Sequence, residues 1–195
     1  MKKIFNSIKK HFLTYICLIV VGFVSCFYFL ELKNMPRNEE LISIFVGAKG
    51  NNNSLLTKFD KQKPDYIRKI QYRQFLVTDS GFNQNYKNFS YNLSDIIIIP
   101  RSKIFVDDVP ICFAKLNTET ISEFSSLFAF YDLSDEKYGF LIHQAQSNDN
   151  DYLDYGEGEE DEDYFAFIKR GSIHGGSLSG SKYRTALDFI KVFSI

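Results

Sequence analysis

The chain has 195 residues, of which 45% are hydrophobic and 24% charged, with 20 Phe, 12 Tyr and no Trp. These fractions exclude an intrinsically disordered protein and indicate a globular domain with ample material for a core. The formal net charge of -1 argues against nucleic acid as the main partner.

Basic residues gather at the N-terminus, and the rest of the chain is mildly acidic. The first 33 residues contain five Lys and one acid, Glu31, which leaves 18 basic and 23 acidic residues beyond them. Of the three Cys, Cys17 and Cys26 lie in this N-terminal part, and only Cys112 remains in the rest. We therefore expect no internal disulfide in the main domain, whose stability must come from its core.

An apolar run, FLTYICLIVVGFVSCFYFL, occupies residues 12–30 without a charge or a Pro. As a helix it would span about 28 Å, close to the thickness of the hydrocarbon layer. Lys side chains precede it, and the positive-inside rule places residues 1–11 in the cytoplasm. We predict a single-pass protein of the cell membrane, with a transmembrane helix at 12–30, a linker at 31–40 and an extracellular domain at 41–195.

Two other anchors stay open, and both leave the domain outside the cytoplasm. A cleaved signal peptide is disfavoured because bulky residues follow Gly22 where a small-residue cleavage site is needed. Lipidation of Cys26 is disfavoured because Phe23 is bulky for such a site and the residues after the Cys are apolar.

The outer domain opens with LISIFV at residues 41–46, which predicts a buried strand. A loop follows, and Asn53 or Ser54 is positioned to cap a short helix that runs through Phe59. Partial alternation predicts a second strand at residues 66–77.

Residues 80–93 are polar and predict a loop or a short helix, and the four Ile at 96–99 predict a strand that is buried on both faces and ends at Pro100. Four further elements complete the domain: a helix at 118–130, a hairpin of 131–133 with 138–142, a strand at 164–168 and a helix at 182–193. The whole pattern predicts an α/β fold, a mostly parallel sheet with helices on both faces, preceded by one transmembrane helix.

Two polar segments have compositions that occur in calcium-binding or phosphate-binding loops. The acidic run at 149–163 lacks the Gly-centred register of a calcium loop and is expected to be a solvated loop. In the Gly/Ser-rich segment at 171–182, Ser181 stands before Lys182, so the spacing of a phosphate-binding loop is missing and a connector is expected.

Residues with catalytic chemistry are few. His143 and His174 stand alone, without the spacing of zinc ligands, and Cys112 is expected to be a small buried residue. A surface hydrolase would need a Ser or Cys within hydrogen-bond reach of a His. We therefore expect no enzyme, no metal and no cofactor.

Five short motifs follow one another in a distinctive order. They are residues 64–67 (PDYI), 94–100 (SDIIIIP), 113–117 (FAKLN), 136–142 (EKYGFLI) and 165–173 (FAFIKRGSI). In this order the chain resembles the first lobe of bacterial extracytoplasmic solute-binding proteins, the type 2 periplasmic-binding-protein-like receptors of ABC importers. The resemblance implies a single α/β lobe. Two features depart from the family: no second lobe follows, and Ile168 stands where Asn is usual.

Ligands of open α/β sheets bind outside the carboxyl ends of the strands. The candidate ligand-binding residues in such loops are Asn52, Asn53, Ser54, Arg101, Ser102 and His143. We predict a membrane-tethered, non-catalytic extracytoplasmic binding module, related to solute-binding proteins, whose partner is a small solute or a membrane protein. The alternative is an envelope interaction or scaffold protein that binds no small molecule.

Overall fold

The computed structural model describes residues 11–49, 54–147, 152–155 and 161–194. The chain divides into two compact units, Met1–Arg37 and Asn38–Ile195. Each unit is an independent cluster of contacts, so the apolar N-terminal segment and the folded domain are separate parts of the molecule.

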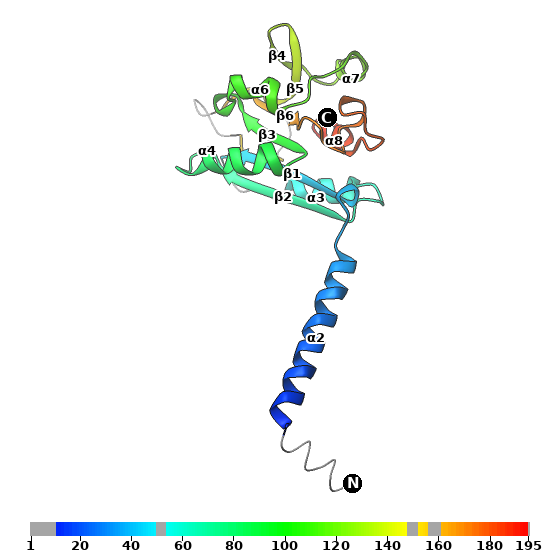
Figure 1. Ribbon diagram of the computed structural model, residues 1–195. Coiled ribbons are helices and arrows are strands. Elements are labelled where there is room, and N and C mark those ends of the chain that lie inside the picture. Colours follow the sequence, from blue (N-terminus) through cyan, green and yellow to red (C-terminus); the bar gives the residue numbers. More distant parts are fainter. Residues whose placement is uncertain (1–10, 50–53, 148–151, 156–160, 195) are drawn as a thin grey trace. The chain divides into compact units, whose positions relative to one another are not determined.

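The first unit contains one long helix, α2 (Phe12–Asn34) (Figure 1). Its end lies four residues beyond the predicted span, and Met35 then adopts an extended backbone. The part Thr14–Asn34 is long and apolar enough to cross a membrane, and none of it is buried in protein. An N-terminal signal sequence has the same length and composition.

The second unit is built on one six-stranded sheet with the strand order β2-β1-β3-β6-β5-β4 (Figure 1). The strands are β1 (Leu41–Ala48), β2 (Lys69–Leu76), β3 (Ile96–Pro100), β4 (Phe130–Leu133), β5 (Glu136–His143) and β6 (Tyr164–Ile168). Strand β1 pairs in parallel with β2 and β3, whereas the pairs β3–β6, β6–β5 and β5–β4 are antiparallel.

The α/β class is confirmed, but the prediction of a mostly parallel sheet is wrong for the half that contains β4, β5 and β6. The β4–β5 hairpin turns at Ser134 and Asp135, whose φ angles of 51° and 66° suit a tight two-residue turn. Strand β6 then fills the gap between β5 and β3 in the reverse direction. All its residues are buried, as in β3, so its composition does not distinguish the two directions.

Helices cover both faces of the sheet, as predicted. On one face lie α3 (Ser54–Gln62), α7 (Thr118–Phe124) and α8 (Thr185–Ile190). The other face carries α4 (Phe82–Asn85), a π-helical turn η2 (Tyr86–Ser90), α5 (Tyr91–Leu93) and α6 (Val109–Cys112). Short 3-10 turns are η1 (Asn38–Glu40), η3 (Arg101–Lys103), η4 (Val106–Asp108), η6 (Gly176–Leu178) and η7 (Lys191–Phe193).

The core is split between these two faces. Along β3, Ile96 and Ile98 pack into one hydrophobic cluster, and Ile97 and Ile99 pack into the other. Successive side chains of a strand point to opposite faces, so a run of apolar residues is what a central strand covered on both sides requires.

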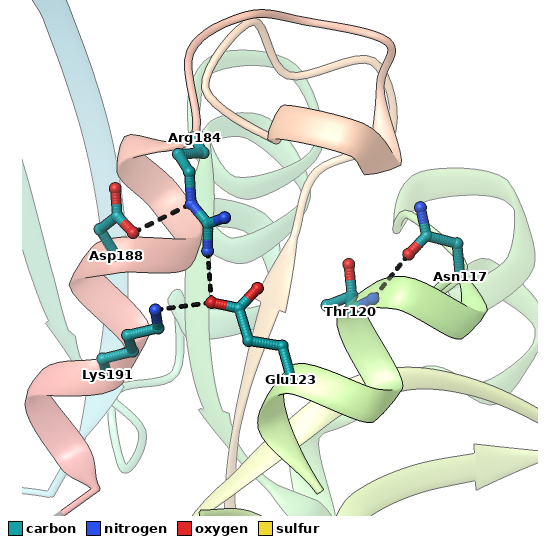
Figure 2. A network of polar contacts seen from close by, with 6 residues as sticks. All are labelled: Asn117, Thr120, Glu123, Arg184, Asp188 and Lys191. Atoms are coloured by element: carbon teal, nitrogen blue, oxygen red, sulfur yellow. Dashed lines mark hydrogen bonds and ion pairs between the residues drawn. The ribbon is translucent and has the colours of Figure 1, made fainter.

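Helices α7 and α8 are tied together by charged side chains (Figure 2). Glu123 Oε1 accepts hydrogen bonds from Arg184 Nη2 and Lys191 Nζ, each at 2.7 Å. Arg184 Nε also donates to Asp188 Oδ1 at 3.1 Å. Helix α7 starts where the Asn117 side chain accepts the backbone N–H of Thr120.

Candidate functional site

A pocket of about 450 Å³ lies at the carboxyl ends of the three parallel-paired strands. Lys49 follows β1, Val77 follows β2, and Ser102 and Lys103 follow β3. The full lining is Lys49, Val77, Thr78, Asp79, Ser80, Phe82, Asn83, Ser102, Lys103 and Glu162.

The pocket lies at the point where the chain connections change sides. After β1 the chain enters α3, which buries Leu55 and Phe59 on one face of the sheet. After β3 it enters α6, which buries Val109 on the other face. Because neighbouring strands send their connections to opposite faces, a crevice opens between them, and such a crevice is the usual ligand site of an open α/β sheet.

The floor of the pocket is apolar and depends on a close approach of Phe82 to strand β1. A Cβ atom added to Gly47 would lie 2.7 Å from Phe82 Cζ. Glycine at this position therefore leaves the space that the ring occupies. Lys103 Nζ lies 5.9 Å from the centre of the same ring, within the range of a weak cation–π contact.

Several polar side chains of this pocket are not used by the fold. Within the described part of the chain, neither Lys49 nor Lys103 forms an ion pair, and neither does Asp79. The side chains of Ser80 and Asn83 likewise make no hydrogen bond to the described residues.

A second pocket, of about 420 Å³, lies at the opposite edge of the sheet, where β1 and β3 begin and β6 ends. Several of its polar groups are hydrogen-bonded to one another or to the backbone. Asp95 accepts the Ser43 N–H at 2.9 Å and the Ser172 hydroxyl at 2.7 Å. The Ser43 hydroxyl donates to Gln71 at 3.0 Å, and Lys169 Nζ donates to the Asn92 carbonyl at 2.8 Å. This network joins strands β1 and β2 to the segments that flank β3 and β6, so its role is structural.

Three consecutive carboxylates hold the loops next to the first pocket. Asp161 Oδ1 lies 2.9 Å from His143 Nε2. Glu162 accepts the Ser102 N–H and hydroxyl at 2.9 and 3.0 Å, and Asp163 lies 3.5 Å from Arg101 Nε. The expectation of a solvated acidic loop is therefore wrong for residues 161–163, because each carboxylate has a partner on another loop.

The His143–Asp161 pair is the most buried of these contacts, with side chains 4% and 11% exposed. Burial raises the pKa of Asp161, but hydrogen bonds from His143 and from the Gln146 N–H outweigh burial and leave the pKa below its ordinary value. The His143 ring stacks on Tyr155 with centroids 3.9 Å apart. Ser147 Oγ lies 3.4 Å from His143 Nδ1, while its hydroxyl donates to the Gln144 carbonyl at 2.6 Å.

Comparison with known proteins gives one weak structural match. No family model and no curated protein matches the sequence. Among solved structures the chain is similar to the maltose/maltodextrin-binding domain MalE from Bdellovibrio bacteriovorus bound to maltotriose, at 13% sequence identity and a TM-score of 0.38. The match covers 54% of this chain and spans 28% of the length of that one.

Of the four candidate residues that the structure describes, Ser102 lines the first pocket. Arg101 precedes Ser102 in the chain and contacts Asp163. His143 is the last residue of β5 and contacts Asp161. Ser54 Oγ donates to the Tyr152 carbonyl at 3.2 Å. Asn52 and Asn53 lie outside the described residues.

Seven polar residues that line the pocket are not among the sequence-based candidates. Lys49 and Lys103 lie in loops that are expected to bind ligand, next to candidate residues. Four others belong to the segment after the second strand, to which the same rule of strand carboxyl ends applies, and one belongs to the acidic segment. The seven are Lys49, Thr78, Asp79, Ser80, Asn83, Lys103 and Glu162.

Proposed function

We propose that this chain is a membrane-tethered, non-catalytic binding module, related to solute-binding proteins, whose folded domain lies outside the cytoplasm. In this proposal α2 is the single-pass anchor, and the pocket at the carboxyl ends of β1, β2 and β3 takes a small polar solute. The polar side chains that line the described part of this pocket are those of Lys, Asp, Glu, Ser, Thr and Asn residues.

The contrast between the two edges of the sheet carries this proposal. At one edge Asp95 accepts hydrogen bonds from Ser43 and Ser172, and Ser43 donates to Gln71, which joins the strands. At the other edge Lys49, Lys103 and Asp79 line an open pocket without ion pairs to described residues. Charged groups that a fold does not use, gathered in a crevice of about 450 Å³, are typical of a small-molecule site.

Ligand screening of the full chain tests the proposal. We expect the thermal unfolding midpoint to rise with one class among sugars, amino acids and short peptides, because a ligand that binds only the folded state stabilises it. The response must vanish in a Lys49→Gln, Lys103→Gln double variant and persist in a Lys61→Gln variant, whose side chain is exposed on α3.

The absence of any response across the three classes would contradict solute binding and favour the envelope scaffold. One observation supports that second function: three large apolar side chains between residues 93 and 111, in α5, η4 and α6, are exposed. Leu93 is 51% exposed, Val106 49% and Ile111 66%. Co-purification of a membrane protein that is lost in an Ile111→Ser variant would then identify the scaffold role.

A further inference from the structure

We infer that the pocket at the carboxyl ends of β1, β2 and β3 takes a small zwitterion, a molecule of the amino-acid class that carries one carboxylate and one ammonium group. This inference rests on the proposed function, since it names the solute that the same pocket would hold.

Three charged groups of the pocket have no ion pair with a described residue, and they are separated along the strand order. Asp79 belongs to the segment after β2, the edge strand of the sheet. Lys49 follows β1 and Lys103 follows β3, on the two sides of the switch point. The described lining is therefore negative toward β2, and it carries two ammonium groups between β1 and β3, with Glu162 beside Ser102 and with Asp161 in electrostatic interaction with Lys49.

Glu162 is the second carboxylate of the described lining, and its oxygens are already hydrogen-bonded. They accept the N–H and the hydroxyl of Ser102, at 2.9 and 3.0 Å. These neutral donors hold the carboxylate in place without cancelling its negative charge. Among the described residues, Asp79 is therefore the carboxylate of the lining whose oxygens have no hydrogen-bond donor, and it lies in the same pocket as two ammonium groups.

Each other class of ligand leaves one of these charges unmatched. An anion without a positive group would face Asp79, and a cation without a negative group would face both Lys side chains. The hydroxyls of a neutral sugar would hydrogen-bond these groups but would bring no opposite charge to any of them. A zwitterion places its carboxylate toward Lys49 and Lys103 and its ammonium toward Asp79.

The remaining lining suits the rest of such a molecule. Val77 and Phe82 give an apolar floor for a short side chain. Ser80 and Asn83, which make no hydrogen bonds to the described residues, offer donors and acceptors at the rim.

The test compares matched ligands on matched variants of the full chain in nanodiscs of phosphatidylglycerol, a lipid without an ammonium group. Calorimetric titration with each common amino acid identifies the one that binds most tightly. Its deaminated acid and its decarboxylated amine are then titrated in the same way. We expect the amino acid to bind about tenfold or more tightly than either, as for charge pairs in a partly dry site.

Three variants assign the charges. Asp79→Asn should weaken the amino acid, and it should strengthen the deaminated acid because a like charge is removed, so that the two bind with similar affinity. Lys49→Gln and Lys103→Gln should weaken both about tenfold. Lys61→Gln and Asp65→Asn, at exposed positions outside the pocket, are the controls and should stay within about twofold.

The outcomes separate this inference from the proposed function. If the deaminated acid binds as tightly as the amino acid, or if only a sugar of the ligand screen binds and the charge variants leave its affinity unchanged, the zwitterion is wrong and solute binding stands. If no probe binds, both fail. Phosphatidylethanolamine offers the same charge pair, so nanodiscs that contain it form a second arm. Loss of amino-acid binding there would assign the zwitterion to a lipid headgroup.

Discussion

Among single residues, Gly47 has the largest influence on the shape of the candidate pocket. Its Cα lies against the Phe82 ring, and Phe82 forms part of the pocket floor. We expect Gly47→Ala to force this ring aside and to lower the free energy of unfolding by about 1–3 kcal/mol, as for other overpacked cores. Denaturant unfolding of the full chain measures this change, and the ligand affinity should fall with it.

Gly81→Ala is the matched control for this substitution. A Cβ at Gly81 would meet one atom within 4 Å, Asn85 Nδ2 at 3.9 Å, which is an ordinary contact. Its effect on the free energy of unfolding should stay within about 0.5 kcal/mol. Equal losses in the two variants would show that the Phe82 contact is not the cause.

Some helices are joined by side chains that lie far apart in the sequence, and Glu123 is the clearest example. Its bonds from Lys191 and Arg184 join α7 to α8 (Figure 2). The hydrogen bond from Lys191, followed by that from Arg184, outweighs burial and holds the pKa of Glu123 below its ordinary value. The side chains of Glu123, Arg184 and Lys191 are 33%, 43% and 38% exposed, so solvent screens the contact.

We therefore expect Glu123→Gln to lower the free energy of unfolding by roughly 0.2–1 kcal/mol at low salt. A carboxylate with a lowered pKa stabilises the fold above its ordinary pKa, and this contribution disappears as the pH falls through the lowered value. The difference between wild type and variant should therefore shrink in acid and in high salt. Glu119→Gln, in the same helix, is the control, and a difference that is independent of pH would contradict the assignment.

Strands were easier to predict than their directions. The runs at 41–46, 96–99 and 164–168 appear as strands, because buried strands need continuous apolar residues. The direction of β6 depends on a hairpin and on pairing with β3, neither of which its own five residues encode. The helix predicted at 118–130 ends at Phe124, since residues after it turn toward β4.

The position of the open pocket agrees with the sequence-based expectation more closely than the residues that line it. The rule of strand carboxyl ends points to the edge of the sheet where this pocket lies. It did not distinguish Ser102, which binds Glu162 sixty residues away, from Lys103, which forms no ion pair among the described residues. Which polar group is free depends on distant segments of the chain, and a local sequence pattern does not contain this information.

On the scale of the whole molecule, the proposed topology depends on the charges before α2. Lys2, Lys3, Lys9 and Lys10 are expected to keep the N-terminus in the cytoplasm. A C-terminal epitope tag should therefore be removed by protease added to intact cells. Replacing the four Lys by Glu should protect the tag, and a Cys26→Ser variant should stay in the membrane fraction.

Two results would contradict this topology. A wild-type tag that resists protease until the cells are lysed would place the domain in the cytoplasm. Release of the Cys26→Ser protein from the membrane would identify a lipid, rather than α2, as the anchor.

The acidic segment that precedes β6 has a further consequence for the backbone around the pocket. The Glu162 carboxylate accepts a hydrogen bond from the backbone N–H of Ser102. In the same way Asp163 accepts the N–H of Ala145, and Asp161 accepts the N–H of Gln146. Three amide protons from two loops thus depend on one short stretch of main chain. If that stretch detaches, we expect all three amide protons to become open to exchange with solvent together, so that their protection from hydrogen exchange is lost as one unit.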